Sequence, residues 1–247
     1  MAAIDNAVNK SVIKLEDELN KISLVVESMA FFYENKSFIP QHLFERFTNP
    51  FLNELNGIKA LAWAPKILGT EKDIFQKFTL IKEVDSKNNL VPSKTRDLYY
   101  PVRVLNPATP FKKVLGYNIY SDSTKRDVIL RSIKTNKPAI SSLITLISDN
   151  TNTKGILALK SVNNPKTGEH KGIVLGVYRM DKLISETLNS EVKVLDICIH
   201  DEVDDAILFS NVDESKVTDK IFSKTVIKRT IKAVDREWQV HFVPKPE

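Results

Sequence analysis

The sequence predicts an α+β fold in which a long N-terminal helix is followed by two β-rich units with antiparallel sheets. Three observations lead to this prediction. Residues 1–35 carry an apolar stripe at helical spacing without a Gly or Pro. Residues 36–180 alternate strand-like segments, turn residues and helical segments. Residues 181–247 begin with a short helical segment and continue as strands, which indicates a second, smaller unit.

Composition is that of an ordinary globular protein and disfavours several functions. Of the 247 residues, 42% are hydrophobic and 27% are charged, and the formal net charge is +5. Basic residues are dispersed among acidic ones, so we expect no nucleic-acid partner, because such partners select a concentrated basic stripe. The seven Gly form neither a GxGxxG nor a phosphate-loop motif, and we expect no cofactor. No run of about 18 apolar residues occurs, so no membrane span is expected within the chain.

Residues 1–35 predict one long helix. Its apolar stripe alternates spacings of four and three residues, as in a heptad repeat: Val8, Val12, Leu15, Leu19, Ile22, Val26, Met29 and Tyr33. Charged residues between them form a solvated face. Two interpretations stay open, because the stripe either packs on the helix's own domain or forms the seam of a parallel dimer. One long helix can serve both purposes on different faces.

A second helix and a first strand open the larger β-rich unit. Residues 40–55 predict a helix with an apolar side, which Pro50 kinks or restarts. The period then changes, and the alternation in residues 57–67 predicts a strand. A short helix is expected within residues 69–85, with Thr70 as its N-cap.

In the remainder of the larger unit, the sequence pattern predicts strands before and after one further helix. That helix covers residues 123–135 and is capped by Asp122 and Ser123. The expected strands lie before and after it in the sequence: 98–105, 112–120, 140–147, 155–163 and 172–180. Turns are expected at 149–155 and 164–171. A five- or six-stranded antiparallel sheet with helices on one side fits this order.

The smaller unit begins with a predicted helix at 181–189 and continues with four strands. The strand segments read VKVLDICIHD, AILFSN, FSKTVIKRTIKAV and REWQVHFVP. Cys198 lies in the first of these segments and is expected to be buried. As the one cysteine of the chain, it cannot form an internal disulfide.

Catalytic patterns are missing from the sequence. The four His residues have no Cys or second His at metal-ligand spacing, and the acidic segment HDEVDD (200–205) lacks the central Gly of a calcium loop. No G-x-S-x-G nucleophile motif occurs, and paired carboxylates lie on faces predicted to be exposed. We therefore expect neither a metal site nor an enzyme, and the chain is predicted to bind rather than to catalyse.

Six segments, in this order and spacing, resemble a CHASE domain: GIKALAWAPKI, EKDIF, YYPVRVL, LGYNIYSDSTKRDVILRSIKTNKPAISS, GILALKSV and GIVLGVYRMDKL. CHASE domains are the extracytoplasmic sensor regions of histidine kinases, diguanylate cyclases and related receptors, including the plant cytokinin receptors. The resemblance by motif covers about residues 36–184. It implies a long N-terminal helix followed by two tandem PAS-like antiparallel-sheet subdomains, with flanking transmembrane helices outside this chain.

The resemblance also implies a division of roles along the chain. Residues 1–35 would form the signalling and dimerisation helix, and a homodimer through this helix is expected. Residues 36–180 would form the membrane-distal subdomain that holds the ligand. Residues 181–247 would supply the connecting helix and the membrane-proximal subdomain.

The function implied by the resemblance is that of an extracytoplasmic small-molecule sensor in a membrane receptor, on the periplasmic or extracellular side of the membrane. Ligand binding would be transmitted through the long helix and the membrane to an output domain outside this chain. That output would be a histidine kinase of a two-component system or a cyclic-nucleotide signalling enzyme. The alternative is a ligand-free structural or dimerisation module of a membrane protein.

Ligand-binding positions are carried over from the family one residue at a time. Asn118 occupies the place where plant receptors use an Asp that hydrogen-bonds the adenine ring, and Leu159 occupies that of a pocket Thr. Trp63 matches a pocket Tyr, and Thr135 matches a pocket Thr. Ile140 marks the strand whose backbone is expected to meet the ligand.

Tyr100 is a further ligand-binding candidate, because Tyr99 and Tyr100 alternate faces on one strand and one of them should point inward. Structural explanations exist beside the functional ones: Trp63 would also suit core packing, and Thr135 would also suit the end of its helix. Because two polar pocket positions of the family are altered here, cytokinin is not the expected ligand. The identity of the small molecule stays open.

Overall fold

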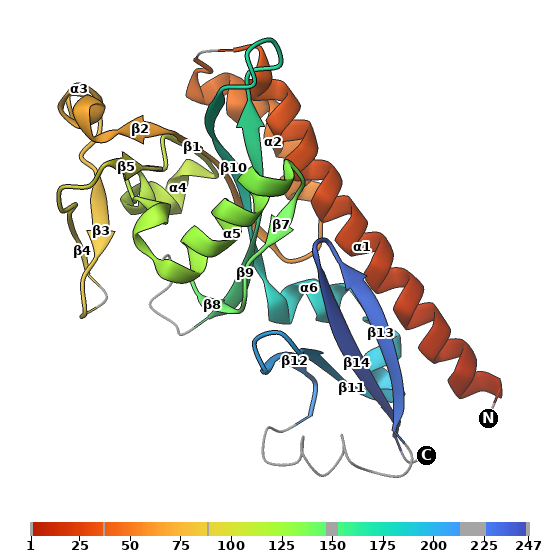
Figure 1. Ribbon diagram of the computed structural model, residues 1–247. Helices are drawn as coiled ribbons and strands as arrows, with labels where there is room; N and C mark the ends of the chain where they lie inside the picture. The colour runs from red at the N-terminus through yellow and green to blue at the C-terminus, as the bar shows by residue number, and fades with distance from the viewer. Residues whose placement is uncertain (1, 37, 88, 147–152, 213–225, 246–247) are drawn as a thin grey trace.

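The computed structural model describes residues 2–36, 38–87, 89–146, 153–212 and 226–245. One long helix, α1 (Ala2–Glu34), runs beside two antiparallel sheets that follow each other along its length (Figure 1). The predicted α+β fold with a long N-terminal helix is confirmed. Among the helices of the described residues, none combines the length and the apolar character that a membrane crossing requires.

Within the described residues, the larger sheet has six strands, all paired in antiparallel fashion. Their order is β6–β1–β10–β9–β7, and β8 also pairs with β9. The bounds of the strands are β1 (Ile58–Pro65), β6 (Val104–Asn106), β7 (Ala139–Ile140), β8 (Ile144–Thr145), β9 (Lys154–Asn163) and β10 (His170–Arg179). The register places Trp63 opposite Val174 and Leu175 opposite Leu159. The predicted antiparallel sheet of five or six strands is thus present.

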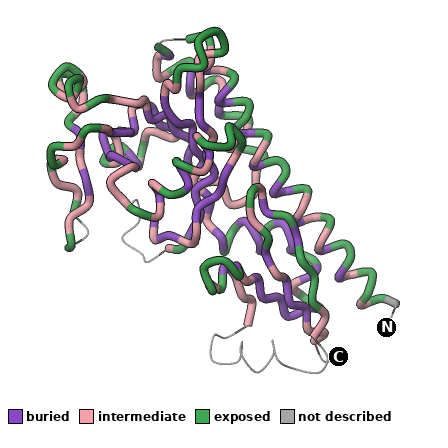
Figure 2. The backbone as a smooth tube through the Cα atoms, in the orientation of Figure 1, coloured by how far each residue is buried: buried purple, intermediate pink, exposed green. Residues whose placement is uncertain are grey.

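The larger sheet presents two apolar faces, because side chains alternate along each strand. On β1, Leu61 and Trp63 belong to the core beside α1, whereas Ala60, Ala62 and Ala64 belong to the core on the opposite face. The central strands are buried along most of their length (Figure 2). Strands that are apolar on both faces need a covering layer on each.

Helices cover both faces of the larger sheet. α1 and α2 (Gln41–Glu54) pack on the face that carries Trp63. α5 (Ser123–Thr135) packs on the other face through Val128 and Ile129. The prediction of helices on one side was wrong, because an uninterrupted apolar run does not reveal which of its residues meets which layer.

The region predicted as strands at 98–105 and 112–120 is more irregular than expected. The first segment contains only the short strand β5 (Leu98–Tyr99) and the beginning of β6. The second segment forms no strand. After β6 the chain passes through three short helices: α4 (Ala108–Phe111), η2 (Lys112–Val114) and η3 (Ile119–Ser121).

Gly116 explains why the second of these segments leaves the strand conformation. Its φ of +82° is in the left-handed region, and a Cβ at this position would lie 2.0 Å from the carbonyl oxygen of Leu80. Glycine alone tolerates such an approach. The next residue, Tyr117, then joins Lys82 through a single bridge instead of a ladder.

The segment predicted as a short helix within 69–85 is divided into smaller elements. In order along the chain, these and their neighbours are β2 (Ile67–Leu68), η1 (Gly69–Glu71), α3 (Lys72–Gln76), β3 (Lys82–Val84) and β4 (Leu90–Pro92). β2 pairs with β5, and β3 pairs with β4. The prediction that Thr70 is an N-cap was wrong. Thr70 lies inside η1, whose N-cap is Leu68, and the carboxylate of Glu71 accepts the backbone N–H of Leu68 at 2.8 Å.

The smaller sheet has the strand order β12–β11–β14–β13 in the described residues. Its elements and the connection to it are α6 (Met180–Thr187), η4 (Glu191–Lys193), β11 (Leu195–Asp201), β12 (Ala206–Ser210), β13 (Ile227–Ala233) and β14 (Arg236–Pro244). The predicted helix and four strands are present. The predicted turn at 149–155 and residues 222–225 of the third strand segment lie largely outside the described residues. Cys198 is buried as predicted, and burial raises its pKa to about 11.

α1 connects the two sheets through its heptad face. Seven of the eight heptad residues belong to one buried core that includes residues of both sheets, and Val12 packs against that core. Two polar contacts add to it: Lys14 Nζ lies 2.9 Å from a carboxylate oxygen of Glu191, and Glu18 accepts the backbone N–H of Asn56 at 3.0 Å. The heptad stripe therefore packs on the chain's own domain.

The turn between β13 and β14 ties the smaller sheet to the larger one. Asp235 in this turn accepts the backbone N–H of Ile140 at 2.8 Å through one carboxylate oxygen. Its other oxygen accepts from Arg131 Nε at 3.0 Å. Since Arg131 lies on α5 and Ile140 on β7, one carboxylate holds α5, the larger sheet and the smaller sheet together.

Candidate ligand-binding site

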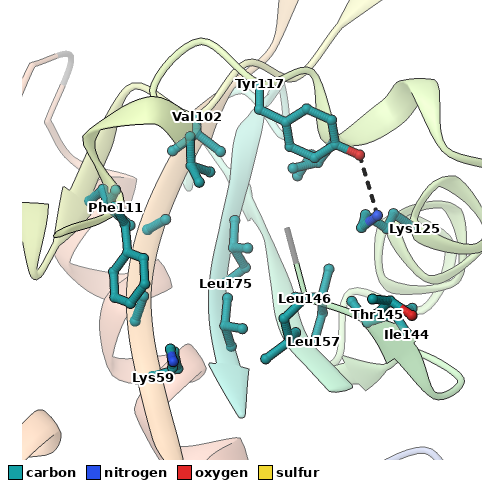
Figure 3. A pocket seen from close by; sticks show the side chains of 16 residues that line it. Lys59, Val102, Phe111, Tyr117, Lys125, Ile144, Thr145, Leu146, Leu157 and Leu175 are labelled. Carbon is teal, nitrogen blue, oxygen red and sulfur yellow. Dashed lines mark hydrogen bonds between the residues drawn. The ribbon is translucent and has the colours of Figure 1, made fainter. Parts of the chain in front are cut away.

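An apolar cavity of about 70 Å³ lies on the α5 face of the larger sheet (Figure 3). On the sheet side it is lined by Ala60 and Ala62 from β1, Leu157 from β9, and Leu175 and Val177 from β10. The two alanines leave space that larger side chains would fill. The cavity is thus a consequence of the small residues that alternate along β1.

The remaining apolar lining comes from the segment before α5, which includes the short strand β6 and irregular turns, and from the segment after α5 that contains β8. The contributing side chains are Val102, Leu105, Phe111, Val114, Ile119, Ile144 and Leu146. Several of these residues lie in the region where the chain departs from the predicted strands. The same irregular backbone therefore closes the cavity over the sheet.

One end of the cavity is polar. Lys125, in the first turn of α5, donates from Nζ to the Tyr117 hydroxyl at 3.3 Å (Figure 3). It also donates to Asp122 Oδ2 at 3.1 Å. Asp122 also caps α5 by accepting the backbone N–H of Lys125 at 3.0 Å, which confirms its predicted role. The side chain of Lys125 is only 8% exposed, so its ammonium group meets protein and cavity rather than bulk water.

Both polar groups keep their protons at neutral pH. Burial by itself would lower the pKa of Lys125, but Tyr117 and Asp122 together raise it above its ordinary value. Burial raises the pKa of the Tyr117 hydroxyl. The polar end of the cavity therefore presents a positive charge and donor groups.

The other polar side chains of the lining are Lys59 and Thr145. Lys59 Nζ lies 5.4 Å from the ring centroid of Phe111, an arrangement in which the ring face stabilises the cation. The described lining residues include no Asp or Glu. Elsewhere in the described residues, no three or more His, Cys, Asp or Glu side chains gather at metal-binding distance. This chemistry suits an apolar molecule that bears a hydrogen-bond acceptor.

Asn118 is fully buried and holds together the backbone beside the cavity. Its Oδ1 accepts the backbone N–H of Tyr100 at 2.9 Å, and its Nδ2 donates to Glu83 Oε1 at 3.3 Å. Burial would raise the pKa of Glu83, but hydrogen bonds from Arg96, Ser93 and Asn118 outweigh burial and lower it. The two sequence neighbours of Asn118 line the cavity, so its hydrogen bonds position them.

Three other residues predicted for the ligand site lie in the core around the sheet. Trp63 lies on the α1 face, where its ring stacks on Tyr33 with centroids 4.3 Å apart. Tyr100 and Leu159 belong to the core on the cavity face but are not among the residues that line the cavity. The ring of Tyr100 instead lies 5.3 Å from that of Tyr120.

Thr135 and Ile140 lie beyond the cavity, at the far end of α5. The Thr135 hydroxyl is exposed and donates to the Arg131 carbonyl at 2.9 Å at the end of the helix. The backbone N–H of Ile140 is used in the contact with the smaller sheet. Of the six, Tyr100 and Asn118 are joined by a hydrogen bond in the part of the chain that the structure describes. The ligand-binding role of all six stays a prediction.

Sequence reasoning missed Tyr117 and Lys125 as candidate site residues. A lysine in an amphipathic helix is ordinarily assigned to solvent, and only the folded backbone around it shows that Lys125 is buried. Two signals were available in the sequence. Ala60 and Ala62 alternate on one face of a strand, and Asp122 lies three residues before Lys125, a spacing that allows an ion pair.

The sequence matches the family described as the CHASE domain over residues 38–209. A relative from Oryza sativa subsp. japonica, probable histidine kinase 5, is 27% identical in an alignment over 165 residues that covers 60% of this chain. The chain spans only 14% of the length of that relative.

Two solved structures share the fold of this chain. The first is an extracellular ligand binding receptor from Desulfohalobium retbaense DSM5692. It has a TM-score of 0.63 at 11% identity, and the match covers 96% of this chain and 39% of the receptor chain. The second is the ligand binding domain of the Pseudomonas aeruginosa PAO1 amino acid chemoreceptor PctC in complex with GABA. It has a TM-score of 0.58 at 11% identity, and the match covers 98% of this chain and 100% of the PctC chain.

The long helix followed by two antiparallel-sheet units is the fold of ligand-binding domains such as these two. The chain belongs to the CHASE domain family. The resemblance seen in the sequence and the predicted sensor role are thereby confirmed.

Asn118→Asp tests the structural role of Asn118. The new side chain keeps an acceptor for Tyr100 but cannot donate, and it brings a second carboxylate close to Glu83, which the amide now contacts at 3.3 Å. We expect urea unfolding at pH 7 to show a loss of about 1–3 kcal/mol, because like-charge repulsion replaces a buried hydrogen bond. The repulsion raises the pKa of the new carboxyl, so the loss should shrink as the pH falls through that raised value.

The wild type must be measured at each pH, because the lowered pKa of Glu83 acts in the opposite direction. Its contribution to stability is present above the ordinary carboxyl pKa and is lost at more acidic pH. Asn164→Asp is the matched control, since the side-chain oxygen of Asn164 accepts from the backbone N–H groups of Lys166 and Thr167 in a turn and a carboxylate keeps this acceptor. An Asn118→Asp protein as stable as the control at pH 7 would show that the contact with Glu83 contributes nothing.

Proposed function

We propose that this chain senses a small, mostly apolar molecule that binds in the cavity between the alanine face of β1 and α5. The observation that carries this proposal is the cavity itself, with Ala60 and Ala62 on one side and the donors Tyr117 and Lys125 at one end. An apolar space with a few convergent polar groups is the usual form of a small-molecule site. The proposed site lies in the larger unit, residues 36–180.

The setting of this sensor would be the periplasmic or extracellular side of a cell membrane. In this arrangement residues 36–180 form the membrane-distal subdomain, and residues 181–247 form the connecting helix and the membrane-proximal subdomain. The family and the kinase relative support an output domain of the histidine kinase class, or a cyclic-nucleotide signalling enzyme, elsewhere in the receptor. The sensor domain itself would not be catalytic.

Transmission from the cavity to the rest of the receptor would begin at α5. This helix supplies Lys125 to the cavity and, farther along, Arg131 to the contact with Asp235 of the smaller sheet. A ligand that pulls on the first turn of α5 therefore acts on the element that orients the smaller sheet. Both sheets pack on α1, so a change in their relative position reaches the long helix. The ligand shifts this equilibrium only as far as it prefers one of the two arrangements.

We further propose that a second copy of this chain docks on the solvent face of α1. The heptad face is already used within the chain, but Ile13, Leu24 and Phe31 are exposed by 60%, 61% and 72%. Their spacings of eleven and seven residues place them on one side of the helix. Sedimentation velocity should show a dimer that Phe31→Glu dissociates and Phe78→Glu, at an equally exposed Phe, does not. A monomer at every concentration would contradict this arrangement.

A thermal-shift screen of small metabolites, including adenine derivatives, tests the location of the site. At a ligand concentration of about 100 Kd, binding stabilises a protein by about 2.7 kcal/mol, or about 5–10 °C in Tm for a chain of this size. Ala62→Leu should fill the cavity and abolish the shift caused by the best ligand. Trp63→Phe should preserve the shift, because Trp63 lies on the opposite face of the same strand.

Ala62→Val is a milder filling variant for the case in which the larger Leu side chain strains the core. Each variant is compared with its own ligand-free form. A shift that Trp63→Phe removes and both Ala62 variants retain would place the ligand on the α1 face. A screen in which no molecule changes the Tm would favour the ligand-free structural module instead.

A further inference from the structure

We propose that the ligand is a small apolar monocarboxylate that carries no ammonium group. Its carboxylate would accept hydrogen bonds from Lys125 and Tyr117, and its hydrocarbon tail would lie over Ala60 and Ala62. This assignment rests on the proposed function and names the chemical class of molecule that the same cavity selects.

The polar end of the cavity has donors left for a carboxylate. The Lys125 ammonium has three hydrogens, and within the described residues it uses two of them, on Tyr117 and Asp122. The Tyr117 oxygen accepts from Lys125, which leaves the phenolic proton to donate. The Lys125 nitrogen and the Tyr117 oxygen lie 3.3 Å apart, close enough for the two oxygens of one carboxylate to accept from both. Hydrogen bonds between charged partners are also the stronger ones.

The charge around Lys125 leaves room for a second anion. The side chain of its partner Asp122 is 38% exposed, whereas that of Lys125 is 8% exposed. Solvent therefore screens the carboxylate of Asp122 more than it screens the ammonium. A ligand carboxylate can therefore approach the Lys125 ammonium from the cavity side and share it with Asp122.

An amino acid would fit this cavity poorly. Its ammonium group would need a carboxylate or several carbonyl groups, because a buried charge without a partner costs several kcal/mol. The described lining offers no Asp or Glu, and its charged side chains are both lysines. The cavity therefore favours the deaminated form of an aliphatic amino acid over the amino acid itself.

The volume of the cavity limits the length of the tail. About 70 Å³ is roughly half of an engineered apolar cavity of 150 Å³ that accepts benzene. A branched end of about three carbons is of the right size by this comparison. Isovalerate (3-methylbutanoate) ends in such an isopropyl group, and it differs from L-valine only by the α-ammonium group.

Isothermal titration calorimetry with isovalerate, isovaleramide and L-valine tests the assignment. The three probes share the branched tail, but the amide removes the negative charge and valine adds the ammonium. We expect isovalerate to bind the wild-type protein at least about tenfold more tightly than either of the others, since a hydrogen bond to a charged group contributes about 1.5–3 kcal/mol.

Two variants assign the donors. Lys125→Met keeps the apolar stem and should weaken isovalerate about tenfold or more while changing isovaleramide by less than about threefold. Tyr117→Phe removes only the hydroxyl and should also weaken isovalerate. Lys137→Met, at an exposed lysine near the end of α5, is the control and should change neither affinity. Circular dichroism confirms that each variant is folded.

The outcomes separate this inference from the proposed function. If isovalerate fails to bind, or binds no more tightly than the amide or valine, the monocarboxylate assignment is wrong. The proposed function survives that result when another molecule binds and Ala62→Leu abolishes its binding. If Ala62→Leu leaves the affinity of every ligand unchanged, the proposed function is wrong, whatever the class of the ligand.

Discussion

The two apolar faces of the larger sheet are the constraint on which the rest of the structure depends. One face meets the heptad stripe of α1, and this packing continues into the smaller sheet, so that a single helix contacts both units. The other face carries Ala60 and Ala62, and α5 with the irregular chain before it covers that face without filling the space above them. The packing contact with α1 and the small cavity therefore lie on opposite faces of the same strands.

The structure explains why position 118 carries an Asn where the plant receptors carry an Asp. The resemblance to plant receptors placed Asn118 where those receptors use an Asp toward their ligand. Here the amide accepts from Tyr100 and donates to Glu83, and a carboxylate could not make the second contact. The donors that face the cavity are instead Tyr117 and Lys125. The recognition chemistry that we propose is accordingly cationic, which is the opposite of an acidic ligand-binding residue.

Regular elements were predictable from the sequence because their periodicity is local. The heptad stripe of α1 repeats a spacing of seven residues. The alternation of β1 and the cap of α5 at Asp122 each lie within fewer than ten successive residues. The segment around Gly116 was predicted as a strand and is not one, because its path follows from a close approach to Leu80, far away in the sequence. Lys125 was missed for the same reason: its burial depends on that path. The fold could thus be predicted largely from the sequence. The cavity could not, because it depends on contacts between segments that are distant in the sequence.

The central claim is that an apolar cavity lies between the alanine face of β1 and α5. Methyl carbon-13 NMR spectra recorded under xenon pressure test it most directly, because xenon enters apolar cavities without requiring a particular functional group. The largest chemical-shift changes are expected at the methyl groups of Ile119, Leu157 and Leu175, which line the cavity. Little change is expected at Ile22, which is buried beside the opposite face. Unchanged cavity methyl groups, or the largest changes around Ile22, would contradict the account.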